Sequence, residues 1–331
     1  MICVLRERAS SRDLFDEAYN PRLAESVDET VTETTLLRGR PLAEEIRTTV
    51  SDDLETLCSH GVTPTLGTVL MSDDAAAKSF MDRKHEVCES VGIPTERVDV
   101  AADAPAADLY AAVERLAADD DVTAVFVQVP LPEHVEDVAV RDRVPAEKDV
   151  DCFAHENLGR LVAGEPRITP ATPAAVLALL RSHDVETAGE DVVVVGRTTA
   201  ICKPLANRLL ARGADGDATV TVCHTATRDL AAKTRSADVL VTAAGTPGLV
   251  DASMVAEGIT VVDVSVNRVA ANADDGYELV GDVDFEGVRE KASAITPVPG
   301  GVGPLTLAFL LRNVVDVTAR ANGVSLPGRP D

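Results

Sequence analysis

Short apolar segments alternate with amphipathic ones along most of this chain. Residues 63–71, 95–102 and 122–132 predict strands, and residues 75–92 and 104–121 between them have the spacing of amphipathic helices. This β-α-β-α-β order predicts a parallel sheet with right-handed crossovers. The nearly unbroken apolar run at 122–132 fits a strand that is buried on both faces.

A second block of the same kind follows a predicted loop at 145–153. Its expected elements are helices at 169–185, 203–213 and 227–237 and strands at 190–197, 218–224, 238–245, 259–267 and 277–283. Short helices between parallel strands predict a nucleotide-binding sheet. Helices are also expected at 39–61 and 304–322, and the second of these is apolar on more than one face and must pack between elements.

The composition limits the partners and the setting of the protein. The hydrophobic fraction of 45% indicates a globular chain, and the formal net charge is -24 with only six lysines among 31 basic residues. Such a surface disfavours nucleic acid and anionic membranes. It suits a protein that is soluble at high salt, although an ordinary acidic cytosolic protein is the alternative.

The six cysteines form no CxxC pair and predict neither a metal cluster nor disulfides. We see no apolar run long enough to cross a bilayer and no secretion signal, so we expect a cytoplasmic protein without a membrane partner. Residues 1–33 are polar and acidic, and we expect a poorly ordered tail or an extension from a misplaced start.

One lysine lies within the apolar face of the helix predicted at 75–92. On a helical wheel Phe80, Val87 and Cys88 share one side, and Lys84 falls in the middle of that side. Either the lysine stem packs while its amine reaches water, or the amine is buried because it takes part in chemistry. The wheel alone favours the first interpretation.

The turn at 192–204 predicts a dinucleotide site, because a strand there runs into a glycine and then a helix. Only Gly196 of the usual G-x-G-x-x-G pattern is present, so an ordinary strand-helix connection is equally compatible. The next strand ends without an acid and is followed by hydroxyls and Arg228. With Arg197 added, this favours NADP over NAD, unless both arginines simply face solvent.

Three further segments carry candidate site residues. Gln128 is the one amide in the strand at 122–132, where it either binds a ligand at the strand's carboxyl end or pairs with loop backbone. Asp151 belongs to a loop with two other acids, and loop carboxylates are usually solvated. The segment 295–306 is rich in glycine and proline, which predicts a shaped turn that lets backbone approach a flat ligand.

Taken together, these segments resemble the bifunctional methylenetetrahydrofolate dehydrogenase/methenyltetrahydrofolate cyclohydrolase family. The resemblance covers residues 35–322. It rests on the helix with Lys84 and on LLRGRPLAEEIR, VQVPLP, PAEKDVDCF, NLGRL, TPATP, VVVGRT, ATVTVCH, ADVLVTAAGTP, VVDVSVNR, GDVDF and ITPVPGGVGPLT. It implies oxidation of 5,10-methylenetetrahydrofolate to 5,10-methenyltetrahydrofolate with NADP and hydrolysis to 10-formyltetrahydrofolate, within the one-carbon metabolism that serves purine biosynthesis.

The resemblance also implies roles for particular residues. Lys84 matches the catalytic lysine, Gln128 its hydrogen-bond partner, and Asp151 the carboxylate that holds the pterin. Expected substrate contacts are Phe80, Val129, Pro130, Leu131, Pro299, Gly300 and Gly303. Expected NADP contacts are Gly196, Arg197, Thr198, Thr225 and Val266. The family's chemistry needs no metal, and its members usually form homodimers through the cofactor domain.

The family implies an α/β fold with two parallel-sheet domains. Residues 34–155, with about 297–325, are expected to form an N-terminal catalytic, folate-binding domain. Residues 156–296 are expected to form a Rossmann-like NADP-binding domain, and the C-terminal helix is expected to return to the first domain.

Several positions depart from the family pattern. Phe80 replaces a tyrosine and Ala77 a serine, which removes two hydroxyls near Lys84. Other departures are Cys152, Thr198, Cys202 and Ser265. Because hydride transfer depends mainly on positioning whereas water activation needs a proton network, we predict a working dehydrogenase with a weakened cyclohydrolase. The alternatives are a dehydrogenase alone, the same reaction on a methanopterin carrier, or an inactive dinucleotide-binding paralogue.

Overall fold

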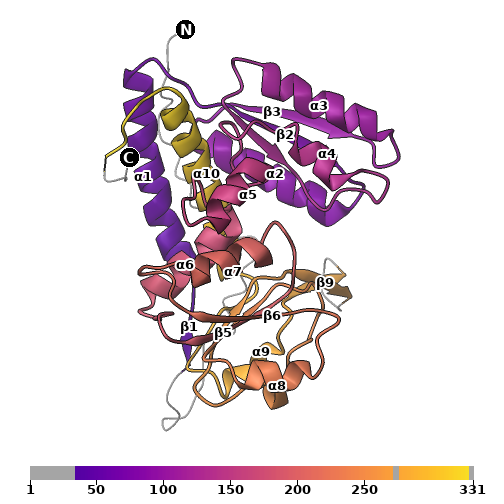
Figure 1. The fold of residues 1–331 in the computed structure, drawn as a ribbon, viewed down its shortest axis with the longest axis vertical. Coiled ribbons are helices and arrows are strands. Elements are labelled where there is room, and N and C mark those ends of the chain that lie inside the picture. Colours follow the sequence, from indigo (N-terminus) through magenta and orange to yellow (C-terminus); the bar gives the residue numbers. More distant parts are fainter. Residues whose placement is uncertain (1–33, 271–275, 328–331) are drawn as a thin grey trace.

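The computed structural model describes residues 34–270 and 276–327. The described chain forms two lobes, each built on a parallel sheet, with long helices running between them (Figure 1). The acidic segment 1–33, for which we predicted a tail, lies outside the described residues. The predicted α/β class with two parallel sheets is confirmed.

The first lobe holds a three-stranded parallel sheet in the order β3-β2-β4. Its elements are β2 (Leu66–Met71), α2 (Ala75–Ser90), β3 (Thr95–Val100), α3 (Ala106–Ala118) and β4 (Ala124–Val127). All residues of the central strand β2 are buried, as expected for a strand that is covered on both faces. Strand β4 is shorter than the predicted 122–132, because Pro130 has no N–H to continue the ladder.

The second lobe holds a six-stranded sheet in the order β1-β11-β8-β7-β5-β6, and every neighbouring pair is parallel. The strands are β1 (Thr35–Leu36), β5 (Asp191–Val195), β6 (Thr219–Cys223), β7 (Val239–Thr242), β8 (Thr260–Asp263) and β11 (Ala294–Ile295). The helices between them are α7 (Cys202–Leu210), α8 (Leu230–Arg235), the 3-10 helix Ala252–Met254 and α9 (Phe285–Arg289). The strand order reverses at β5, since β6 lies on one side of it and β7 on the other.

Two parts of the second lobe differ from the sequence prediction. The strand predicted at 277–283 is β10 (Tyr277–Val280), which pairs antiparallel with β9 (Asn267–Ala270) in a separate two-stranded ribbon. Strand β1 pairs with β11 in the second sheet, so residues predicted to open the first domain add an edge strand to the other lobe. Two-residue strands carry no periodic signal, which is why the sequence did not reveal them.

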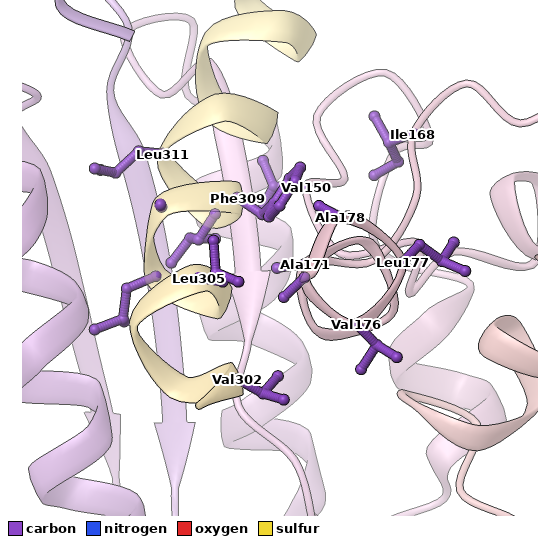
Figure 2. Close-up of a cluster of buried hydrophobic side chains, with 14 of the residues drawn as sticks. Val150, Ile168, Ala171, Val176, Leu177, Ala178, Val302, Leu305, Phe309 and Leu311 are labelled. Carbon is purple, nitrogen blue, oxygen red and sulfur yellow. The ribbon is translucent and has the colours of Figure 1, made fainter. Parts of the chain in front are cut away.

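Helices α1 (Arg40–Ser59), α6 (Ala171–Ser182) and α10 (Val302–Ala321) form the bridge between the lobes. Helix α10 packs against α1 and α6. Figure 2 shows Leu305 of α10 and Ala171 of α6 among the side chains where α10 and α6 meet. The prediction that the last helix packs between elements is confirmed, although it begins two residues earlier and includes Gly303 in its first turn. The sequence also gave no signal for α4 (Asp137–Arg141) or α5 (His155–Val162).

The expectation that no apolar run is long enough to cross a bilayer is wrong for helix α10, which passes this test by length and composition. However, 78% of its apolar window is buried inside the protein. The apolar character of α10 is therefore explained by packing against the neighbouring helices.

Candidate active site

The amine of Lys84 is buried in the first lobe. Asp74 caps the start of α2 by accepting a hydrogen bond from the Ala77 N–H at 3.0 Å. The helix then buries one face, on which Lys84 is only 2% exposed. Its Nζ lies 3.8 Å from the centre of the Phe80 ring and 4.4 Å from that of Phe126. The interpretation in which this amine reaches water is therefore wrong.

Gln128 supplies the polar partner of this amine. The Lys84 Nζ donates to Gln128 Oε1 at 2.7 Å, and Gln128 Nε2 donates to the Val129 carbonyl at 2.7 Å. The backbone N–H of Gln128 donates to the Val69 carbonyl at 2.9 Å. The end of β4 thus fixes the amide in one orientation, with its oxygen toward the lysine.

Burial changes the acidity of Lys84. Desolvation lowers its pKa from 10.5 to about 7, and the negative charge of Asp151 opposes this effect only in part. A lysine with such a pKa exchanges a proton readily near neutral pH, which an exposed lysine does not.

Asp151 lies in the loop that follows the first lobe, as expected, and is partly buried. Its Oδ1 accepts a hydrogen bond from the N–H of Ala171, the first residue of α6, at 2.9 Å. Burial raises the pKa of Asp151 to about 7, although the Ala171 N–H and the nearby Lys84 lower it. The two titratable groups therefore influence each other's charge.

Asp149 shapes this loop, a role that the sequence did not reveal. Its carboxylate is buried and accepts hydrogen bonds from the N–H groups of Asp151, Phe153 and Ala154 at 2.9–3.0 Å. Asn157 of α5 donates to it as well, at 2.9 Å. Asp149 therefore faces inward and holds the loop, which leaves Asp151 as the carboxylate beside Lys84.

The remaining candidate residues gather at the carboxyl edges of the two sheets. Val129, Pro130 and Leu131 follow β4 in the first sheet. In the second sheet, Gly196, Arg197 and Thr198 follow β5, Thr225 follows β6, Val266 follows β8, and Pro299 and Gly300 follow β11. Open α/β sheets bind ligands outside the carboxyl ends of their strands, at the point where the strand order reverses.

The loop after β11 is tied to the start of α1. The Gly300 carbonyl accepts a hydrogen bond from the Gly39 N–H at 3.1 Å, and Gly300 has a φ of 111°, which favours glycine. This contact fixes the segment with Pro299 at the edge of the second sheet, next to the first turn of α10.

Gly196 follows β5, the strand at which the strand order of the second sheet reverses, and it fits a dinucleotide turn. Its φ is 138°, and a Cβ there would lie 2.5 Å from Cys202 Sγ and 2.6 Å from the Ala243 carbonyl oxygen. Only glycine fits, because the turn packs closely against Cys202 and the end of β7. The turn after such a strand is where dinucleotide-binding sheets hold a pyrophosphate. Cys202, a departure from the family pattern, is fully buried, and its Sγ packs against Gly196.

Arg197 and Thr225 lie together, as the NADP prediction requires. An Arg197 guanidinium nitrogen donates to Thr225 Oγ1 at 3.4 Å, which joins the loops after β5 and β6. The segment 224–228 contains no acid to hold an NAD ribose. The pair offers a cation and a hydroxyl to a 2′-phosphate.

Replacing Gly196 with alanine should lower the free energy of unfolding by about 3 kcal/mol, because the new Cβ meets both the Cys202 thiol and a backbone carbonyl in a strained conformation. Urea denaturation measures the change. Gly213→Ala is the matched control, since Gly213 has a φ of 123° but faces open space. Equal losses for the two variants would show that backbone strain alone matters at Gly196.

The geometry defines a class of protein. A dinucleotide turn in one lobe and a buried lysine with a glutamine and a carboxylate in the other indicate a dinucleotide-dependent oxidoreductase that also moves protons. Two family models match, one for each lobe. Residues 37–151 match the tetrahydrofolate dehydrogenase/cyclohydrolase catalytic domain, and residues 170–322 match the NAD(P)-binding domain of the same family.

Similar proteins agree with these matches. The bifunctional protein FolD of Natronomonas pharaonis is 51% identical over 85% of this chain and 95% of its own length. Bifunctional protein FolD 1 of Haloarcula marismortui is 47% identical over 88% of this chain and 99% of its own length. The structure of Trypanosoma brucei N5,N10-methylenetetrahydrofolate dehydrogenase-cyclohydrolase with NADP and an inhibitor has a TM-score of 0.82 at 36% identity, covering 88% of this chain and 99% of that one.

The chain therefore belongs to the tetrahydrofolate dehydrogenase/cyclohydrolase family. It is an NADP-dependent methylenetetrahydrofolate dehydrogenase and cyclohydrolase of one-carbon folate metabolism.

Proposed function

We propose that Lys84 is the group that moves protons in this enzyme. Hydride leaves the methylene bridge of 5,10-methylenetetrahydrofolate and leaves a cationic methenyl carbon. Water then attacks that carbon, and the ring opens to 10-formyltetrahydrofolate. The attacking water must lose a proton, and a base with a pKa near the working pH is best suited to accept it. The observation that carries this proposal is the buried Lys84 amine, whose pKa is about 7.

Gln128 and Asp151 are proposed to complete the catalytic group. The Gln128 oxygen holds the amine in one direction through the 2.7 Å hydrogen bond. Asp151 receives the adjacent N–H donors of the pterin in charge-assisted hydrogen bonds. The substrate is proposed to contact the ring of Phe80 and the loops after β4 and β11, through Val129, Pro130, Leu131, Pro299, Gly300 and Gly303.

The NADP positions are proposed to follow the carboxyl edge of the second sheet. NADP supplies the hydride acceptor when it is bound. Gly196 and Thr198 border the turn that fits the pyrophosphate, and Arg197 with Thr225 offers donors to the 2′-phosphate. Val266 is 55% exposed and leaves an apolar side chain for a cofactor ring.

An absorbance assay for methenyl formation tests the function directly. It is run at high salt, with NADP and then with NAD, on the tetrahydrofolate and methanopterin carriers. We expect turnover with NADP on the folate carrier, with formation of the 10-formyl product as a slower second activity. Binding of NADP without turnover on either carrier would contradict the proposal.

Phe80→Tyr should raise the cyclohydrolase rate more than the dehydrogenase rate. The Phe80 ring lies 3.8 Å from the Lys84 amine, so a hydroxyl on that ring would enter the surroundings of the proposed base. A positioned proton-transfer group contributes about 10²-fold or more when fully effective, and we expect about a tenfold gain from partial recovery of the network. Both rates are measured on one preparation, and an equal change in the two would remove the argument for a weakened cyclohydrolase.

We also propose that the protein is a cytoplasmic, salt-adapted homodimer whose product serves purine biosynthesis. The net charge of -24 with few lysines supports salt adaptation. Strand β6 supports pairing through the second lobe, because it is an edge strand and its Val222 is 40% exposed.

A further inference from the structure

A buried carboxylate lies against the loop after β7, at the edge of the second sheet where NADP is proposed to bind. Asp282 follows β10 and is fully buried. Its Oδ2 accepts from the N–H groups of Ala244 at 2.7 Å and Gly245 at 3.1 Å, and its Oδ1 accepts from the Thr246 N–H at 2.7 Å. Three successive amides after β7 therefore converge on one side chain.

Successive amides that converge in this way form an anion-binding concavity. Here the anion is part of the chain, since the Asp282 carboxylate already occupies the amides. Residues 244–246 are therefore not available to hold a phosphate through these N–H groups. The hydrogen bonds to Asp282 set the conformation of residues 244–246, which form the loop after β7 at the carboxyl edge of the second sheet.

Ser265 joins this arrangement to the loop after β8. Its hydroxyl donates to Asp282 Oδ2 at 2.7 Å and accepts from the Gly245 N–H at 3.2 Å. Its own N–H donates to Asp263 Oδ1 at 3.1 Å. The next residue is Val266, the proposed NADP contact. Ser265 is one of the positions at which this chain departs from the family pattern.

We propose that Asp282 and Ser265 are positioning residues for NADP. They fix the loops after β7 and β8 in the conformation that receives the cofactor, so that binding does not have to order these loops first. The inference rests on the proposed position of NADP at this edge of the sheet. It assigns to the Ser265 hydroxyl an effect on cofactor affinity that acts through the two loops it joins.

Titration calorimetry with NADP tests the inference without needing turnover, so its result is separate from that of the Lys84 proposal. Ser265→Ala loses two hydrogen bonds, and we expect the Kd for NADP to rise about fivefold. Ser265→Thr keeps the hydroxyl and should return the Kd toward the wild-type value. In the assay, Ser265→Ala should raise the KM for NADP while kcat changes little.

Ser253→Ala is the matched control. The Ser253 hydroxyl also donates to a carboxylate of the second lobe, Asp251 Oδ1 at 2.6 Å, but on the exposed 3-10 helix. Its Kd for NADP should equal that of the wild type. An unchanged Kd in Ser265→Ala would overturn the inference, and so would an equal loss of affinity in Ser265→Thr or in the control.

Discussion

Lys84→Met should abolish most cyclohydrolase activity, with a fall in kcat of about 10²–10⁴-fold, while the protein stays folded. The methionine side chain fills the space between the rings of Phe80 and Phe126 but cannot accept a proton. The rate of 10-formyltetrahydrofolate formation from the methenyl compound measures the effect. In the wild type this rate should rise with pH through about pH 7, because the neutral amine is the base, and the variant should lack that rise.

Lys78→Met is the matched control, since Lys78 lies on the same helix with its side chain 48% exposed. Its rate and pH profile should equal those of the wild type. A Lys84→Met enzyme with wild-type cyclohydrolase activity would contradict the role of the amine as the base.

The same variant should change how stability depends on pH. Lys84 has a pKa of about 7 in the folded protein against an ordinary value of 10.5, so the unfolded state binds more protons at this residue between those values. The free energy of unfolding therefore gains a contribution that rises with pH across this window. Urea denaturation at both ends of the window should show the rise in the wild type and a smaller rise in Lys84→Met.

Much of the fold could be predicted from the sequence because its signals are local. Each buried parallel strand is an apolar run bounded by helices, so strands such as β2, β4 and β5 were visible in the sequence. Chain order then indicated parallel sheets. The pairing of β1 with β11 was not visible, since these two-residue strands meet only through contacts between distant parts of the chain.

The candidate site was less predictable than the fold, because the sequence marked individual residues but did not show what surrounds them. The position of Lys84 on an apolar face marked it as unusual, but the wheel could not say whether its amine escaped to water. That answer depends on Phe126 and Gln128, which come from another strand. Asp149 and Asp282 gave no signal, because an acid in a loop sequence looks the same whether it faces solvent or collects backbone amides.

Asp151→Asn should raise the KM for the folate substrate by about 10- to 100-fold. The proposed contact is a pair of charge-assisted hydrogen bonds to the pterin, and the carboxamide retains one acceptor without the charge. The amide oxygen can still accept from the Ala171 N–H, so the start of α6 keeps its contact with the loop. Initial rates at varied substrate concentration measure the effect, and the KM for NADP should stay close to that of the wild type.

The same substitution should move the pH profile of the cyclohydrolase. The Asp151 charge raises the pKa of Lys84, so its removal lowers that pKa further and shifts the rising limb of the profile to lower pH. Glu147→Gln is the matched control, because Glu147 lies exposed in the same loop and loses the same charge. Asp151→Asn could weaken substrate affinity and leave the rising part of the pH profile in place. That result would contradict the influence of Asp151 on the charge of Lys84, and it would leave Asp151 only the role of binding the pterin.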